Sequence, residues 1–194
     1  MRGPDLLWGG DIRTFHPPAG KFDGVIGGPP CKGESNLAYL NGKHGESLWG
    51  EAMRVIEEAR PAWWVLEAVK KHEAPFVVLL SPRWLGEKQS RRRYFHSNLN
   101  LLPFVEVALF EHPEKRRAVL GAHGGREGTT YRRMTTYSWA EMCELQGLPE
   151  GYDLPFTRQA KREAVGNGVP LSMGRAIAKA VKAVVSPETK ERHG

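Results

Sequence analysis

Apolar residues in the first hundred positions form short continuous runs separated by one stretch with helical spacing. Residues 22–26 end abruptly at Gly27-Gly28-Pro29-Pro30, which predicts a short buried strand followed by a loop. Residues 45–60 predict an amphipathic helix closed by Pro61, because the apolar positions recur mostly at intervals of three and four: Leu48, Ala52, Val55, Ile56 and Ala59. Residues 62–66 and 92–96 predict two further strands. A strand, a helix and a strand in this order indicate an α/β protein with a mainly parallel sheet and flanking helices.

The second half of the chain is less regular. Residues 98–136 are rich in Gly, Arg, His and Thr, and we expect an insertion or recognition loop there. Helical spacing returns at residues 138–146, where Ser138 and Glu141 match the capping-box pattern and Gly147 ends the helix. A last helix is predicted over residues 172–185, behind a Ser172 cap.

The composition excludes several classes of protein. The 194 residues are 40% hydrophobic and include six Trp, which excludes a disordered or collagen-like chain and is enough for one core. No apolar run approaches the roughly 20 residues of a membrane span, and the amino terminus lacks a signal-peptide stretch, so we expect a cytoplasmic protein. Cys31 and Cys143 show no CxxC or Cys/His ligand spacing, so neither a disulfide framework nor a metal site is predicted.

The charge of the chain favours a polyanionic partner. Lys and Arg total 28 against 22 acidic residues, which gives a formal net charge of +6. The basic residues gather at 91–93, 115–117, 132–133 and 161–162. Any one such cluster is typical of a solvated face, but together they favour nucleic acid as the partner.

Candidate chemistry lies at the predicted carboxyl ends of the strands, where ligands bind in α/β sheets. Cys31 follows the Gly-Pro-Pro loop, and Glu67 follows the strand predicted at 62–66. A thiolate is a nucleophile, a carboxyl group exchanges protons, and arginines neutralise developing charge. These roles fit attack on a heterocyclic base. The alternative is that Cys31 is simply a small buried hydrophobic side chain with no chemical role.

Six short motifs, in this order, resemble those of the DNA cytosine-5 methyltransferases. They are Gly10-Asp11-Ile12, Gly27-Gly28-Pro29-Pro30-Cys31, Leu66-Glu67-Ala68-Val69, Gln89-Ser90-Arg91-Arg92-Arg93, Glu144-Leu145-Gln146-Gly147-Leu148-Pro149 and Gly166-Asn167-Gly168-Val169-Pro170. Each motif alone is weak evidence, whereas six collinear motifs over most of the chain are specific.

The resemblance implies a shortened class I methyltransferase (Rossmann-like) core that acts on double-stranded DNA with S-adenosylmethionine as cofactor. In the family, a cysteine thiolate adds to C6 of a flipped cytosine, and C5 then takes the methyl group. By position, the implied catalytic residues are Cys31, Glu67, Arg91 and Arg93, and the implied cofactor-binding residues are Asp11, Ile12, Pro30, Asn167 and Val169. The DNA-binding residues are Lys32, Ser35, Gln89, Lys115, Arg116, Arg117, Arg132 and Arg133. Residues 1–97 are expected to form the catalytic core, 98–136 a short DNA-recognition insertion, and 137–194 a segment that returns to the core.

The chain departs from the family pattern on the cofactor side. Nine residues precede Gly10, so the family's glycine-rich first turn is absent, and Lys32, Ala68 and Gly168 replace the usual Gln, Asn and Ser. We therefore expect weak or undetectable binding of S-adenosylmethionine by the lone chain, with a second subunit or a homodimer completing the pocket. Two alternatives stay open: a catalytically silent DNA-binding homologue, and a cytosine-modifying enzyme that uses another donor.

Overall fold

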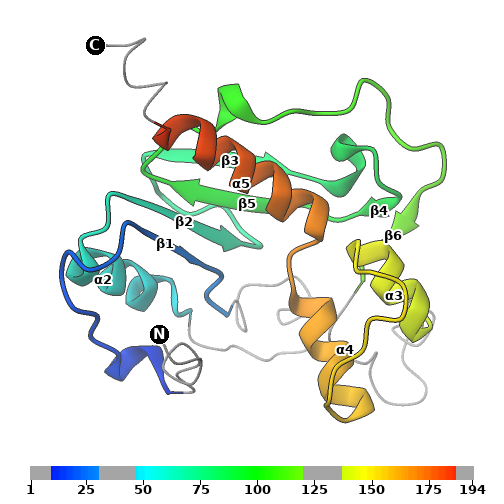
Figure 1. Ribbon diagram of the computed structural model, residues 1–194, viewed down its shortest axis with the longest axis horizontal. Coiled ribbons are helices and arrows are strands. Elements are labelled where there is room, and N and C mark those ends of the chain that lie inside the picture. Colours follow the sequence, from blue (N-terminus) through cyan, green and yellow to red (C-terminus); the bar gives the residue numbers. More distant parts are fainter. Residues whose placement is uncertain (1–9, 31–46, 120–136, 187–194) are drawn as a thin grey trace. The chain divides into compact units, whose positions relative to one another are not determined.

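The computed structural model describes residues 10–30, 47–119 and 137–186. The chain forms two compact units: residues 1–78 with 93–100 (unit 1), and residues 79–92 with 101–194 (unit 2). The elements are η2 (Ile12–Thr14), β1 (Gly24–Gly27), α2 (Trp49–Ala59), β2 (Trp63–Ala68), β3 (Phe76–Leu80), η3 (Pro82–Leu85), β4 (Gln89–Ser90), β5 (Arg93–Ser97), η4 (Leu102–Phe104), β6 (Arg116–Arg117), α3 (Trp139–Gln146), α4 (Arg158–Asn167) and α5 (Leu171–Val185) (Figure 1).

The main sheet is mixed, with strand order β1-β2-β5-β3. β1 and β2 run parallel, with Gly24 opposite Trp63, and the chain passes between them through α2. β5 runs antiparallel to β2, with Leu66 opposite His96. The α/β class is therefore confirmed, and the strands expected at 22–26, 62–66 and 92–96 correspond to β1, β2 and β5. The parallel arrangement holds for β1 and β2 but not for β5 and β2, and β3 was not predicted.

α2 covers β1 and β2 in unit 1 (Figure 1). Its buried side chains Ala52 and Ile56 form one apolar cluster with Trp64 and Leu66 of β2. The helix ends at Arg60, whose φ of 49° lies in the left-handed region typical of a helix C-cap. The helical spacing predicted for residues 45–60 therefore gives the correct buried face. Burial of that face fixes α2 beside the carboxyl ends of both strands.

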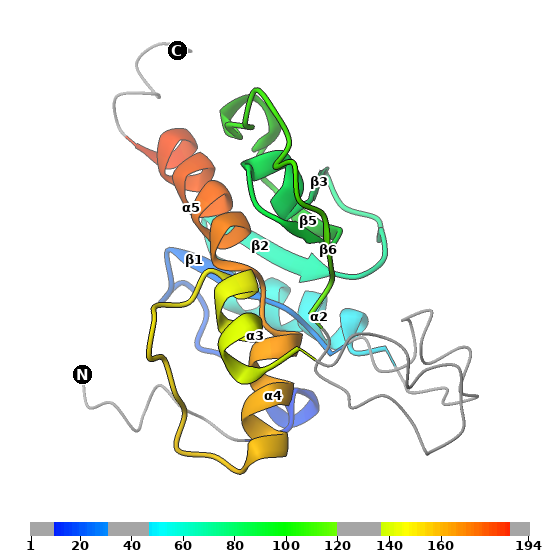
Figure 2. The same cartoon turned by 90° about the vertical axis from the view of Figure 1, so that its right-hand side faces the viewer.

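Unit 2 has its own core between α3 and α4, which lie side by side (Figure 2). Met142 and Leu145 of α3 pack with Val165 of α4. The predicted capping box is confirmed: Ser138 Oγ accepts from the Glu141 N–H at 3.2 Å, and Glu141 Oε2 accepts from the Ser138 N–H at 2.8 Å. α4 was not predicted, because few apolar residues mark its sequence.

α5 begins one residue earlier than expected, and its predicted cap is wrong. The residue at the N-cap is Pro170, which makes no side-chain capping hydrogen bond, and Ser172 lies inside the first turn. Met173, Ile177, Ala180 and Val181 are the buried residues of this helix, which agrees with the predicted helical spacing.

Among the elements that the structure describes, no helix has the length and hydrophobicity needed to cross a membrane.

Candidate active site

Glu67 and Arg93 form an ion pair between two neighbouring strands of unit 1. Arg93 Nε lies 2.6 Å from Glu67 Oε1, and the two side chains are only 17% and 16% exposed. Glu67 of β2 is opposite Phe95 of β5, and Arg93 lies two residues from Phe95. Because side chains alternate along a strand, Phe95 and Arg93 share a face, and Arg93 reaches Glu67 diagonally. The sequence therefore determines both residue types, and the antiparallel register brings them together.

The loop that follows β1 passes directly beside the Glu67 carboxylate. A Cβ atom on Gly28 would lie 3.1 Å from Glu67 Oε2, which is tighter than nine in ten Cβ contacts in proteins. Glu67 itself is the penultimate residue of β2, whereas the sequence analysis placed it just beyond the strand. The predicted nucleophile Cys31 follows Gly28 by three residues and lies outside the described residues, as do Lys32 and Ser35.

A cavity of about 750 Å³ lies in unit 1, between the segment 10–15, the end of β1 and α2. This volume is within the range of small-molecule sites. Three residues that were predicted to bind the cofactor, Asp11, Ile12 and Pro30, all line it. The walls are otherwise mainly apolar, with Val25, Ile26, Phe15, Leu48, Ala52, Val55 and Leu66 among the lining residues.

Asp11 brings a fixed negative charge to the cavity. Its carboxylate accepts hydrogen bonds from Arg13 Nη2 at 2.8 Å and from Arg13 Nε at 3.0 Å. These hydrogen bonds with Arg13 hold the pKa of Asp11 below its usual range. An ionised carboxylate only accepts hydrogen bonds, so Asp11 suits an amine or hydroxyl donor of a ligand.

The glycines at the end of β1 allow a ligand to approach the backbone. A Cβ atom on Gly27 would lie 3.2 Å from Leu66 Cδ2, and one on Gly28 would lie 3.1 Å from Glu67 Oε2. Both glycines line the cavity. An apolar wall, one carboxylate and an exposed glycine backbone together fit a nucleoside-sized group such as that of S-adenosylmethionine.

Arg91 is held by backbone carbonyls inside unit 2. Its side chain is buried, and Nη1 donates to the carbonyl oxygens of Val119 and Gly166, at 2.8 Å in each case. Arg91 thus ties the end of α4 to residue 119. Its predicted action on the target base stays a prediction.

Gln89, which was predicted to bind DNA, is buried inside unit 2, and its contact with DNA stays a prediction. It is 0% exposed; its Nε2 donates to the carbonyl of Leu145 at 2.6 Å, and its Oε1 accepts from the N–H of Val119. Gln146, which the sequence analysis treated only as part of a packing motif, is also buried and accepts from Gln89 Nε2 at 3.1 Å. Gln89 therefore anchors β4, which ends just before Arg91.

The remaining predicted cofactor residues belong to unit 2. Asn167 is the last residue of α4 and is exposed, and Val169 is 36% exposed. The residues that line the cavity all belong to unit 1, and the role of Asn167 and Val169 in cofactor binding stays a prediction.

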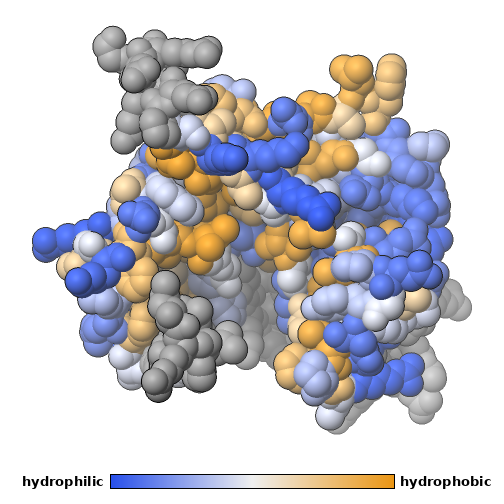
Figure 3. Space-filling model, viewed as in Figure 1, coloured by the Kyte–Doolittle hydropathy of each residue, from blue (hydrophilic) through white to orange (hydrophobic). Residues whose placement is uncertain are grey.

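In the predicted basic cluster at 115–117, one residue forms ion pairs and the other two are exposed. Arg116 pairs with Glu141 at 3.0 Å and with Glu114 at 3.3 Å, and its guanidinium lies 5.5 Å from the Tyr137 ring centroid. Lys115 and Arg117 are exposed. Hydrophilic residues cover much of the face in Figure 3, with hydrophobic residues between them. Arg132 and Arg133 lie outside the described residues.

A buried histidine next to Glu67 was missed in the sequence. His96 is 0% exposed, its Nδ1 donates to the carbonyl of Leu66 at 3.2 Å, and its Nε2 accepts from the N–H of His72 at 2.9 Å. Trp49 stacks on the His72 ring at a centroid distance of 4.1 Å. Burial lowers the pKa of His96, which fits the neutral ring that these two hydrogen bonds require. The only sequence signal was a histidine at the end of a predicted strand.

The family model described as C-5 cytosine-specific DNA methylase matches residues 9–74 and 83–183. The crystal structure of a mutant of DNMT2 from Spodoptera frugiperda is similar at a TM-score of 0.51 and 13% identity, over 84% of this chain and 80% of that chain. This likeness shows the fold. A protein assigned as a DNA modification methyltransferase, encoded within an E. coli prophage, matches at a TM-score of 0.29 and 19% identity, over 50% of this chain and 32% of that chain. That weaker likeness has no bearing on fold or function. No curated protein matches the chain.

Proposed function

The chain belongs to the C-5 cytosine-specific DNA methylase family, and we propose that it transfers a methyl group from S-adenosylmethionine to C5 of a cytosine flipped out of double-stranded DNA. The observation that carries this proposal is the ion pair of Glu67 and Arg93 beside Gly28. Gly28 begins the loop that leads to Cys31, so a carboxylate with a fixed orientation lies where this loop starts.

Cys31 is the proposed nucleophile. Its thiolate forms a bond to C6 of the cytosine, and the electrons of the C5–C6 double bond make C5 nucleophilic. After C5 is methylated, loss of the C5 proton restores the double bond and expels the thiolate. The other cysteine, Cys143, is a poor candidate, because it is buried and burial raises the pKa of its thiol.

Glu67 and Arg93 are proposed to engage the target base. Glu67 faces the N3 side of the ring, as the family resemblance implies. Arg93 neutralises the carboxylate and restricts its rotamers, which lowers the cost of orienting Glu67 in the transition state. Their low exposure strengthens this electrostatic contact, because water screens it little.

Asp11, Ile12 and Pro30 are proposed to hold the cofactor in the cavity of unit 1. When bound, S-adenosylmethionine supplies an electrophilic methyl group. The ionised Asp11 accepts a hydrogen bond from the nucleoside, and Ile12 packs on its apolar surface. Asn167 and Val169 stay predicted cofactor residues, and a second subunit or homodimer that completes the pocket stays a prediction.

Trapping the covalent intermediate tests the proposed function. A DNA duplex with 5-fluorocytosine at the target lacks the C5 proton whose loss frees the enzyme. With S-adenosylmethionine, the protein should therefore form a DNA adduct that survives denaturing electrophoresis. Cys31→Ala should abolish the adduct without weakening DNA binding, and the matched control Cys143→Ala should keep it.

Two outcomes would overturn the assignment. An adduct that persists in Cys31→Ala would place the nucleophile elsewhere. Tight DNA binding with no adduct on any duplex that contains 5-fluorocytosine would instead favour the silent homologue.

A further inference from the structure

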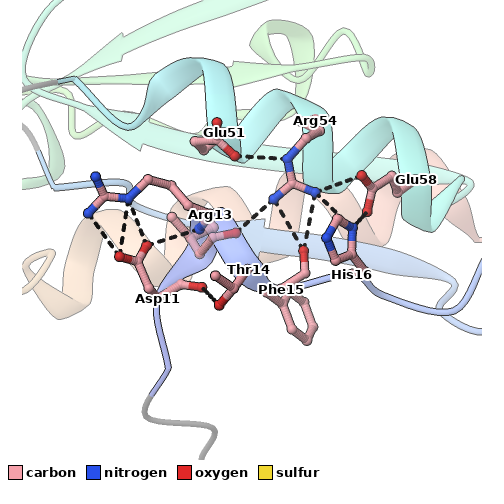
Figure 4. Close-up of polar contacts among 9 residues, drawn as sticks. Asp11, Arg13, Thr14, Phe15, His16, Glu51, Arg54 and Glu58 are labelled. Atoms are coloured by element: carbon pink, nitrogen blue, oxygen red, sulfur yellow. Dashed lines mark hydrogen bonds and ion pairs between the residues drawn. The ribbon is translucent and has the colours of Figure 1, made fainter.

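Arg54 joins the two sides of the cavity in unit 1. It lies in the middle of α2, and its guanidinium reaches across to the segment that contains η2 (Figure 4). Nη2 donates to the carbonyl of Ile12 at 2.7 Å, and both Nη1 and Nη2 lie 3.2 Å from the carbonyl oxygen of Phe15. These two carbonyls lie at the start and just past the end of η2, so one side chain holds both ends of the turn.

Two glutamates of α2 orient the guanidinium toward this turn. Arg54 Nε donates to Glu51 Oε2 at 2.8 Å, and Nη1 donates to Glu58 Oε1 at 2.6 Å. Glu58 Oε2 also lies 3.0 Å from His16 Nδ1, which is a second contact between α2 and the segment that contains η2. The hydrogen bonds with Glu51 and Glu58 raise the pKa of Arg54, so the side chain stays charged. Each of the three nitrogens of the Arg54 guanidinium therefore donates at least one hydrogen bond.

Within the turn that Arg54 holds, the hydrogen bonds are local: Asp11 caps the N–H of Arg13, and Thr14 Oγ1 donates to the carbonyl of Asp11. η2 is three residues long and has no buried residue, and short 3-10 helices have poor hydrogen-bond geometry. Yet Asp11, Ile12, Arg13 and Phe15 of this segment line the cavity opposite Ala52 and Val55 of α2. Besides the packing of Ile12 on the cluster that contains Ala52 and Ile56, the contacts of Arg54 are the polar link between this turn and the α2 wall.

We propose that Arg54 is a positioning residue for the cofactor: it fixes the Asp11–Ile12 turn against α2 and thereby sets the affinity for the nucleoside part of S-adenosylmethionine. This inference rests on the proposed function of the cavity. It requires the planar fork of arginine, because a lysine ammonium has three donors and cannot reach two carbonyls and two carboxylates together.

Arg54→Lys is the informative variant, because it keeps the positive charge and the helix propensity. The matched control is Arg175→Lys, an exposed arginine in α5. Titration calorimetry on the full chain should show that Arg54→Lys raises the Kd for S-adenosylmethionine by about ten-fold, through loss of preorganisation. The Kd for DNA and the rate of adduct formation at saturating cofactor should stay within two-fold of the unaltered protein, roughly the spread between replicate preparations.

Hydrogen exchange in the absence of cofactor tests the positioning directly. The amides of residues 12–15 should exchange about ten-fold faster in Arg54→Lys, because the turn opens more often, and those of α3 should not change. Unchanged exchange at residues 12–15, or a cofactor Kd equal to that of Arg175→Lys, would overturn the inference while the proposed function stands. If the unaltered chain alone binds no S-adenosylmethionine, the cofactor half of the inference is overturned for the isolated chain, whereas the proposed function is judged separately by the adduct assay.

Discussion

Gly28 and Glu67 are so close that a single added carbon on Gly28 would lie 3.1 Å from Oε2 of the carboxylate. The loop after β1 is therefore in close contact with the end of β2. A side chain on Gly28 would have to displace the very carboxylate that Arg93 orients.

Gly28→Ala should therefore slow methyl transfer with little loss of stability. A displaced Glu67 is misaligned for the base, and we expect single-turnover methylation at saturating DNA and cofactor to fall about ten-fold. Gly50→Ala is the matched control, because a Cβ there meets nothing within 4 Å and lies in a helix. Full activity in Gly28→Ala would show that the Glu67 position is not critical.

The ion pair of Glu67 and Arg93 should show energetic coupling. Glu67→Gln and Arg93→Met each leave the other group without its charged partner at low exposure, so each should lower the free energy of unfolding by about 2–3 kcal/mol. The double variant should lose less than the sum, with a coupling energy of about 1–3 kcal/mol in a double-mutant cycle. Strict additivity in urea unfolding would contradict the contact.

Ser138 and Ser172 were both predicted to cap a helix, but only Ser138 does so. Ser138→Ala removes the acceptor for the Glu141 N–H and should lower the free energy of unfolding by about 1 kcal/mol. Ser172→Ala should change it by less than about 0.5 kcal/mol, because Ser172 lies inside α5 and does not cap it. Circular dichroism during urea denaturation measures both, and an equal loss in the two variants would reject the observed start of α5.

Salt dependence separates free from engaged basic residues. Lys115→Ala and Arg117→Ala should each lower the slope of log K against log salt by about one unit, equally on all DNA sequences. Arg116→Ala should lower it less, because Glu141 and Glu114 already neutralise its guanidinium. Fluorescence anisotropy at several salt concentrations gives the slopes. A loss confined to one DNA sequence would mean that these residues read bases.

Local patterns in the sequence predicted the elements that depend on local physics. The helical spacing of Ala52 and Ile56 identified α2, the reciprocal bonds of Ser138 and Glu141 identified the start of α3, and continuous apolar runs identified β1 and β2. The order of the motifs indicated the family and the candidates Arg93 and Asp11, and the predicted end of a strand had already singled out Glu67. For the helices and strands, the signal lies within a few neighbouring residues, where spacing and capping act.

The tertiary structure decided what depends on residues far apart in the chain. The antiparallel register of β2 and β5 brings Arg93 onto Glu67, and burial turns Gln89 into an internal support. Arg54 reaches the carbonyls of Ile12 and Phe15 across about 40 positions of sequence, with separations of 42 and 39 residues. No local pattern marks such contacts, because strand register and buried hydrogen bonds are set by the packing of the whole unit. The sequence by itself therefore determined which chemical groups this chain has, and the packing decided which of them meet.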